Sequence, residues 1–209
     1  MIDRLACNLG RNDEAPNIEL AQFLAEHEDT EGIAEIVEGF KGADAKVASD
    51  SIKVLYEIGK RAPQLIAPYT DDFITGLRSR NNRLIWGSMA ALAGTTPYAA
   101  QLVHDDLPLL IRTYEQGSVI TVDNSISVFA HLAAADEGYA EELVPLLLKH
   151  LKECKPKSVA QHAERASVCF DKTNAPAFIE VLERRLPHLS SPAQARVNKL
   201  LRSLHALAY

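Results

Sequence analysis

The histidine and cysteine residues in the last third of the chain are the side chains best suited to metal binding or nucleophilic chemistry. His150 and Cys154 are four residues apart, so on a helix they share one face and could both bind one metal ion. Two donors do not complete a site, and we therefore predict no metal and no cofactor. His162 and Cys169 are seven residues apart, about two helical turns, which is too far for the direct hydrogen bond of a Cys–His nucleophile.

No common catalytic motif occurs in the sequence. It contains no glycine-rich phosphate-binding loop, no GxSxG motif and no HExxH motif. We therefore predict that the protein is not an enzyme, and we assign no catalytic residue. The remaining residue of interest is the only tryptophan, Trp86, which lies in the stretch RNNRLIWGSMAALAG of residues 80–94.

The second half of this stretch recurs at a fixed spacing. SIKVLYEI, SMAALAGT and SISVFAHL begin at Ser51, Ser88 and Ser125, each 37 residues after the one before. Apolar residues follow the same step, with a last step of 35, in three columns: Leu55, Leu92, Phe129, Ala166 and Leu201; Phe40, Leu77, Tyr114, Leu151 and Leu186; and Ile36, Phe73, Leu110, Leu147 and Leu182. The last two columns are four residues apart, one helical turn, so they lie on one helix, the outer helix A. The column that begins at Leu55 lies on a second, inner helix B, so each period holds two helices.

A helix pair of this length cannot bury its own apolar face and must stack on its neighbours. The pattern therefore predicts an all-α, right-handed α-α superhelix, a HEAT- or armadillo-like solenoid of about five helical hairpins. Residues 30–209 form the predicted array, and residues 1–29 a helical cap, within one domain overall. Asp44 is the predicted N-cap of the first helix B. The next repeat is expected to begin at Pro63, and Pro68 is expected to kink its helix A or to delay its start.

One face of the B helices is the predicted binding surface. In repeat one, a helical wheel places five residues opposite the buried stripe: Lys46, Ser49, Asp50, Lys53 and Glu57. Inner helices line the concave side of a solenoid, so we predict a groove whose binding residues are Asn82, Arg83, Trp86, Asp123, Asn124, Ser127, His131, Gln161 and Glu164. A solvent-facing Trp86 would anchor a partner; the alternative is that it packs against the neighbouring B helix.

The polar residues of this face also have two interpretations. The ladder formed by Asp123, Asn124, Gln161 and Glu164 fits a binding groove, but it also fits a solvated helix face without a ligand. Arg83, with Asn81 and Asn82 at a helix start, could hold an anion, and Asn82 could equally be a simple N-cap.

Composition narrows the classes of partner and location. The net charge of −6 and the pI near 5.6 make nucleic acid an unlikely partner, because phosphate-binding domains are usually basic. The sequence contains no run of about 18 apolar residues, so we predict no membrane span and no membrane partner. The start MIDRLACNLGRN lacks the apolar run of a signal peptide. Three cysteines, an odd number, favour reduced thiols, and we expect a cytoplasmic protein.

Several stretches of the chain resemble a family of small bacterial HEAT-like proteins: LGRNDEAPNIELA, SDSIKVLYEIG, SRNNRLIWGSMAAL, GSVITVDNSI and CKPKSVAQHAE. The resemblance spans essentially the whole chain. It implies the HEAT-type fold and brings no activity with it.

Three functions are compatible with these features. The first is a non-catalytic protein–protein interaction module or scaffold, which binds a protein or peptide in the groove. The alternative is an enzyme, because the groove resembles that of HEAT-like DNA alkylation-repair glycosylases, a resemblance that implies Trp86 contacting the base and Asp123 as the carboxylate. The third is a scaffold that self-associates through its A helices or its Tyr209 end.

Overall fold

The computed structural model describes the backbone of residues 1–208 and the side chains of residues 1–206, and every regular element in that range is helical. The chain forms two compact units, Met1–Val128 and Phe129–Tyr209. None of the helices within residues 1–208 combines the length and apolar character that a membrane crossing requires. Tyr209, the predicted self-association end, lies outside the described residues.

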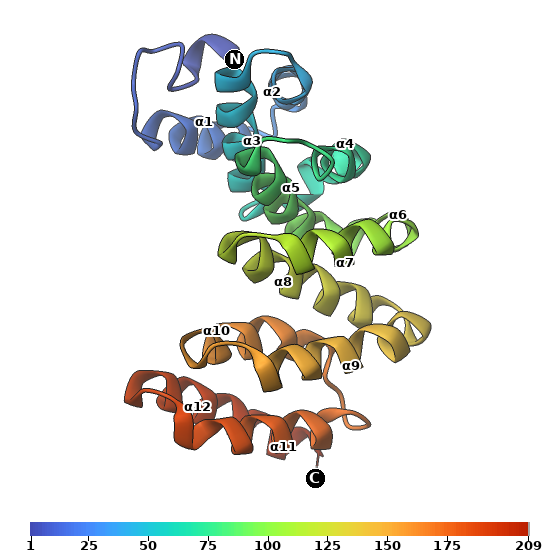
Figure 1. Ribbon diagram of the computed structural model, residues 1–209. Coiled ribbons are helices and arrows are strands. Elements are labelled where there is room, and N and C mark those ends of the chain that lie inside the picture. The colour runs from blue at the N-terminus through green and yellow to red at the C-terminus, as the bar shows by residue number, and fades with distance from the viewer. Residues whose placement is uncertain (209) are drawn as a thin grey trace. The chain divides into compact units, whose positions relative to one another are not determined.

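The first unit contains the predicted cap and the first repeats (Figure 1). Its elements are η1 (Ile2–Arg4), α1 (Ala15–Glu26), α2 (Thr30–Lys41), α3 (Ala45–Gly59), η2 (Pro63–Leu65), η3 (Ala67–Tyr69), α4 (Thr70–Gly76), α5 (Asn82–Thr95), η4 (Thr96–Tyr98), α6 (Ala100–Asp105), α7 (Leu107–Gln116) and the first part of α8 (Val119–Ala135). Helix α3 is its centre, because α1, α2 and α5 all pack against it. The division into a cap of residues 1–29 and an array of residues 30–209 stays a prediction.

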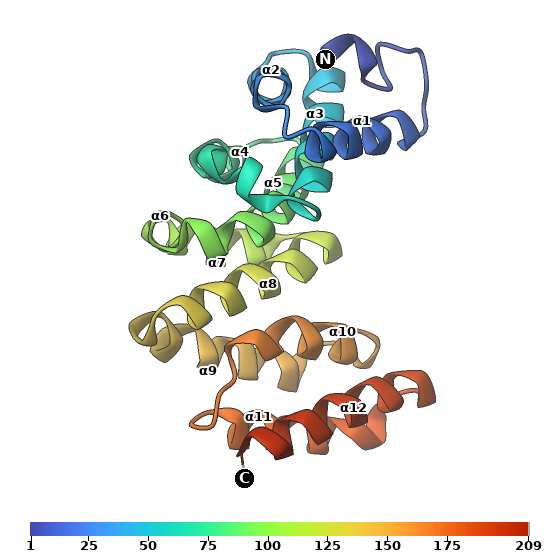
Figure 2. The same ribbon diagram turned by 180° about the vertical axis from the view of Figure 1, so that it is seen from behind.

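The second unit starts within α8 and contains two further helix pairs (Figure 2). Its remaining elements are α9 (Glu137–Glu153), α10 (Pro156–Ala166), η5 (Ser167–Cys169), α11 (Ala175–Arg185), η6 (Leu186–His188) and α12 (Ser191–Ala208). Helix α12 packs against α10 and α11, and α9 packs against both α10 and α11.

The apolar columns predicted from the repeat form the core. All five residues of the column that begins at Leu55, and all five of the column that begins at Ile36, are buried. In the column that begins at Phe40, Tyr114 and Leu186 are half-buried and the other three are buried. The predicted all-α stack of helix pairs is therefore confirmed.

Capping and proline residues set the helix ends. The Asp44 carboxylate accepts hydrogen bonds from the backbone N–H groups of Lys46 and Val47, at 2.8 and 3.1 Å, which confirms it as the N-cap of α3. Pro63 is the first residue of η2 and Pro68 is the second residue of η3, and α4 begins only at Thr70, as predicted for a helix that Pro68 delays.

The cap of α5 differs from the predicted one by one residue. Asn81, and not Asn82, is the N-cap, and its side-chain oxygen accepts from the backbone N–H of Arg83 at 2.9 Å. The reason is the extended backbone of Asn81, with φ −87° and ψ 112°, because an N-cap residue lies outside the helix. Asn82 is the exposed first residue of the helix.

Helices α3 and α5 approach closely through residues without side chains. A Cβ atom added to Gly94 would lie 2.8 Å from the carbonyl oxygen of Gly59, and one added to Gly87 would lie 2.7 Å from the Ile52 side chain. At Gly94 the obstacle is backbone, which cannot rotate away. Two inner helices therefore touch almost main chain to main chain at this point.

We expect Gly94→Ala to destabilise the protein. Alanine in a helix usually gains about 1 kcal/mol over glycine, whereas overpacking costs about 1–3 kcal/mol, and contact with a backbone oxygen gives the larger cost. The free energy of unfolding, measured by urea denaturation, should fall by about 1 kcal/mol or more. Gly138→Ala, in the exposed first turn of α9, is the control: only the Asp136 side chain lies near its added Cβ atom, so the free energy of unfolding should stay the same or rise by up to about 1 kcal/mol. A Gly94→Ala protein more stable than the wild type would contradict the close approach.

Candidate functional site

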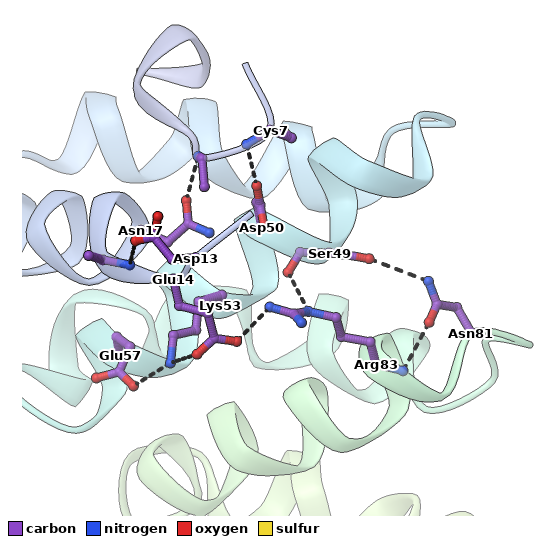
Figure 3. Close-up of polar contacts among 12 residues, drawn as sticks. Cys7, Asp13, Glu14, Asn17, Ser49, Asp50, Lys53, Glu57, Asn81 and Arg83 are labelled. Carbon is purple, nitrogen blue, oxygen red and sulfur yellow. Dashed lines mark hydrogen bonds and ion pairs between the residues drawn. The ribbon is translucent and has the colours of Figure 1, made fainter. Parts of the chain in front are cut away.

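The segment before α1 lies across the start of α3 and is held by buried or half-buried polar side chains (Figure 3). The backbone N–H of Cys7 donates to the Asp50 carboxylate at 2.8 Å, and that of Ala6 donates to the Asn17 side chain at 2.9 Å. Burial, together with the neighbouring Asp50 carboxylate, raises the pKa of the Cys7 thiol. The segment thus closes one side of the surface formed by α3 and α5.

Two residues predicted to be exposed on this face are buried. Lys53 and Glu57 are 5% and 6% exposed, so the prediction of a free polar face along α3 is wrong at these positions. The Lys53 ammonium lies 2.9 Å from a Glu14 oxygen and 3.1 Å from a Glu57 oxygen. The cause is the N-terminal segment, which supplies Glu14 as a partner. Burial works to lower the pKa of Lys53, but its contacts with Tyr56 and the two carboxylates raise it.

The Glu57 carboxylate is neutralised from several sides. Lys60 and Arg61 each approach one of its oxygens to 2.7 Å, in addition to Lys53. Burial alone would raise the pKa of Glu57, but hydrogen bonds from the three basic side chains outweigh burial and lower the pKa to about 2. The charges of Lys53 and Glu57 are thus paired within the protein, and the ion pair between Lys53 and Glu14 holds the N-terminal segment on α3.

A pocket of about 490 Å³ lies beside this network. Its lining comes from the N-terminal segment and from the starts of α3 and α5: Cys7, Gly10, Arg11, Asn12, Ala45, Lys46, Ser49, Asp50, Asn81 and Arg83. Arg11 is held by Asp13 at 2.8 Å, and Arg83 pairs with Glu14 at 2.9 Å. Lys46 is exposed and has no ion pair within residues 1–206. We call this pocket, together with Trp86, the α3–α5 surface.

Trp86 is half-buried on α5. Its ring lies 5.5 Å from the Tyr56 ring, centre to centre, and the Arg83 guanidinium lies 5.9 Å from the centre of the Trp86 ring. Tyr56 belongs to α3, the neighbouring B helix. The predicted packing against the neighbouring B helix therefore describes the contact with Tyr56, and the half-buried side chain keeps part of its surface accessible to solvent. The role of Trp86 as an anchor for a partner stays a prediction.

Three more predicted binding residues lie on α8 within the first unit: Asp123, Asn124 and Ser127. All three are half-buried. The Asn124 side-chain amide donates to the Ile120 carbonyl of its own helix at 2.9 Å, so part of its hydrogen-bonding capacity is used within α8.

The last three predicted residues belong to the second unit. His131 is half-buried on α8, and burial lowers its pKa. Gln161 is half-buried and Glu164 exposed on α10. Glu164 accepts a hydrogen bond from the Arg196 guanidinium at 2.9 Å, and this contact lowers its pKa.

The sequence interpretation missed the part that the N-terminal segment plays. Lys53, Glu57 and Arg61 follow one another at steps of four, which is a visible signal for a charge network on one helix face. Nothing in that spacing indicates Glu14, which is 39 residues before Lys53. The N-terminal segment, which the ion pair between Glu14 and Lys53 holds on α3, forms part of the pocket lining, so the spacing of residues on α3 does not predict the pocket.

Comparison with known proteins identifies the fold class. No protein-family model matches the sequence, and no curated protein matches it. Among solved structures, an engineered protein aligns with 100% of this chain and 98% of its own, with 16% identity and a TM-score of 0.68. A computationally designed armadillo repeat protein for modular peptide recognition aligns with 90% of this chain and 91% of its own, with 14% identity and a TM-score of 0.65.

A second designed armadillo repeat protein, solved in complex with the peptide (KR)4, covers 93% of this chain and 92% of its own, with 14% identity and a TM-score of 0.66. At these identities the likeness concerns the fold alone. The chain is thus an all-α helical-repeat protein with the armadillo- or HEAT-like solenoid fold.

The Glu57 network predicts a defined acid sensitivity. The pKa of Glu57 is about 2 when folded, against an ordinary value of 4.5, so the unfolded chain takes up the proton first as pH falls. The stability from this carboxylate, on the order of 2–3 kcal/mol, is fully present above about pH 4.5 and is lost as pH falls towards 2.

Glu57→Gln should therefore lower the free energy of unfolding at pH 7 and flatten its fall between pH 4.5 and 2, measured by urea denaturation at each pH. Glu19→Gln, on the exposed side of α1, is the control and should follow the wild-type curve. Parallel curves for wild type and Glu57→Gln would show that the network contributes nothing.

Proposed function

We propose that the protein is a non-catalytic scaffold that binds a peptide segment of a partner protein along its inner helices. In the first unit the proposed contacts are Asn82, Arg83, Trp86, Asp123, Asn124 and Ser127. In the second unit they are His131, Gln161 and Glu164. No cofactor takes part in this function.

The observation that carries the proposal is the environment of Trp86. Its ring contacts the Tyr56 ring and the Arg83 guanidinium, and the side chain is only half-buried. A preorganised aromatic side chain of this kind suits a binding hot spot, because little side-chain freedom is lost when a partner covers it.

Polar groups beside Trp86 fit the needs of a peptide main chain. An extended peptide needs partners for its N–H and C=O groups when it is buried. Lys46 lines the neighbouring pocket and offers an ammonium group to a peptide carbonyl, whereas Ser49 and Asn81 of the same lining are hydrogen-bonded to the Ala45 carbonyl and the Arg83 N–H. The net charge of −6 also favours approach by a basic segment.

The fold comparisons support the same function class. One similar solved structure is described as designed for modular peptide recognition, and another is described in complex with (KR)4. Similarity of fold raises the expectation of peptide binding without naming a partner.

The enzymatic alternative is not favoured by a specific observation. The net charge of −6 opposes binding to a phosphate backbone. The glycosylase function with Trp86 and Asp123 stays a prediction from the sequence, as does the cytoplasmic location.

A peptide-display experiment tests the proposal. Peptides selected from a random library on the wild-type protein should bind Trp86→Ala at least about tenfold more weakly in calorimetry, because truncation of a hot-spot residue costs about 2 kcal/mol or more. Tyr98→Ala is the matched control, since Tyr98 is an aromatic residue of the same unit that is 56% exposed in η4, away from the α3–α5 surface.

Tyr98→Ala should bind the selected peptides as the wild type does. If no peptide is selected, or if Trp86→Ala binds with wild-type affinity, the α3–α5 surface is not the binding site. Circular dichroism of each variant separates loss of binding from loss of fold.

A further inference from the structure

The second unit brings three metal-binding side chains together where α9 ends. His150 lies in the last turn of α9, Cys154 is the residue that caps this helix, and His162 comes from the middle of α10. Nε2 of His150 lies 2.7 Å from Nδ1 of His162, and the donor atoms of all three residues lie within 4.8 Å of one another.

The third donor changes the reading of the sequence. The i, i+4 pair His150 and Cys154 gives only two ligands, and His162 lies on the next helix, so its spacing along the chain does not indicate a third ligand. The turn between α9 and α10 folds His162 back onto His150, with ring centres 4.8 Å apart. Two histidines and one cysteine then form a complete three-donor set.

Burial makes this cluster unlike a chance group of surface side chains. His162 is 2% and His150 is 9% exposed, and both are on the apolar side of their helices. The short contact between their nitrogens requires that one ring nitrogen carries a proton and the other presents a lone pair.

We propose that His150, Cys154 and His162 bind one transition-metal ion of borderline or soft character, with Zn²⁺ as the ion to test first. Imidazole nitrogen and thiolate sulfur are the donors that such ions prefer over carboxylate oxygen. Three protein donors leave the fourth tetrahedral position to water or to another exchangeable ligand. This site is independent of the proposed peptide binding.

Small movements convert the cluster into a metal site. Tetrahedral Zn²⁺, with bonds of about 2.0–2.3 Å, holds its donors about 3.4 Å apart. The two ring nitrogens are 2.7 Å apart, so they must separate slightly, while the sulfur must approach. The proposal requires rotations of the three side chains that make these changes.

The proton changes on binding are simple. Cys154 releases its thiol proton to solvent and binds as the thiolate, while the histidine that donates in the pair moves its proton to its other ring nitrogen. Arg185 of α11 holds the backbone at the end of α9, because its guanidinium donates to the carbonyl oxygen of Lys152 at 2.7 Å and to that of Cys154. Cys154 is half-buried, which gives the ion a path to the site.

Metal titration of the full chain tests the proposal. Protein freed of metal by chelator and reducing agent should bind one Zn²⁺ per chain in equilibrium dialysis with elemental analysis. Cys154→Ala and His150→Gln should each weaken binding at least about tenfold. Co²⁺ in place of Zn²⁺ should give a thiolate-to-cobalt absorption band in the wild type that Cys154→Ala lacks.

Two variants of the same unit serve as controls. Cys169→Ala removes a buried thiol and His188→Gln an exposed imidazole, and both should bind Zn²⁺ as the wild type does. If wild type binds no Zn²⁺ at micromolar concentration, or if Cys154→Ala and Cys169→Ala bind alike, the cluster is a hydrogen-bonded histidine pair and no metal site. The cobalt spectrum of the wild type decides the question even where a histidine variant does not fold.

Discussion

The apolar stripe of each helix pair can be covered only by the next pair, and the structure depends on this constraint. In the first unit α3 satisfies it by packing against α1, α2 and α5 at once. The approach of Gly94 to the Gly59 carbonyl shows how close two inner helices come. Such closeness fixes the spacing of the side chains that project beside it, including Trp86. Burial along the repeat thus sets the geometry of the proposed binding surface.

The fold could be predicted from the sequence because its determinants are local and periodic. Leu55 and its counterparts at steps of 37 and 35 residues are buried in every repeat, so the sequence shows the same apolar position five times. Asp44 and the two prolines, Pro63 and Pro68, act on their own helix ends and could be identified for the same reason. The misplaced cap at Asn82 shows the limit, because two adjacent asparagines offer the same side-chain chemistry.

The candidate site was less predictable because single contacts between distant segments decide it. A helical wheel shows which side of α3 Lys53 occupies, but it cannot show that Glu14 will cover that side. The same limit applies to His162, which lies twelve residues beyond His150 along the chain and becomes its neighbour only through the turn after Cys154. Periodicity identifies faces of helices, and the pairing of non-repeated polar residues needs the three-dimensional structure.

The degree to which charges are already satisfied separates structural from functional polar groups in this protein. Glu57 is surrounded by three basic side chains, and its pKa of about 2 records how completely they stabilise its charge. Such a carboxylate has nothing left to offer a partner, and it secures the segment that forms one wall of the neighbouring pocket. Lys46, which is exposed, and Trp86, which is half-buried, lie next to this network and are accessible to a partner. A fixed scaffold beside unused groups is the arrangement that lowers the entropic cost of recognition.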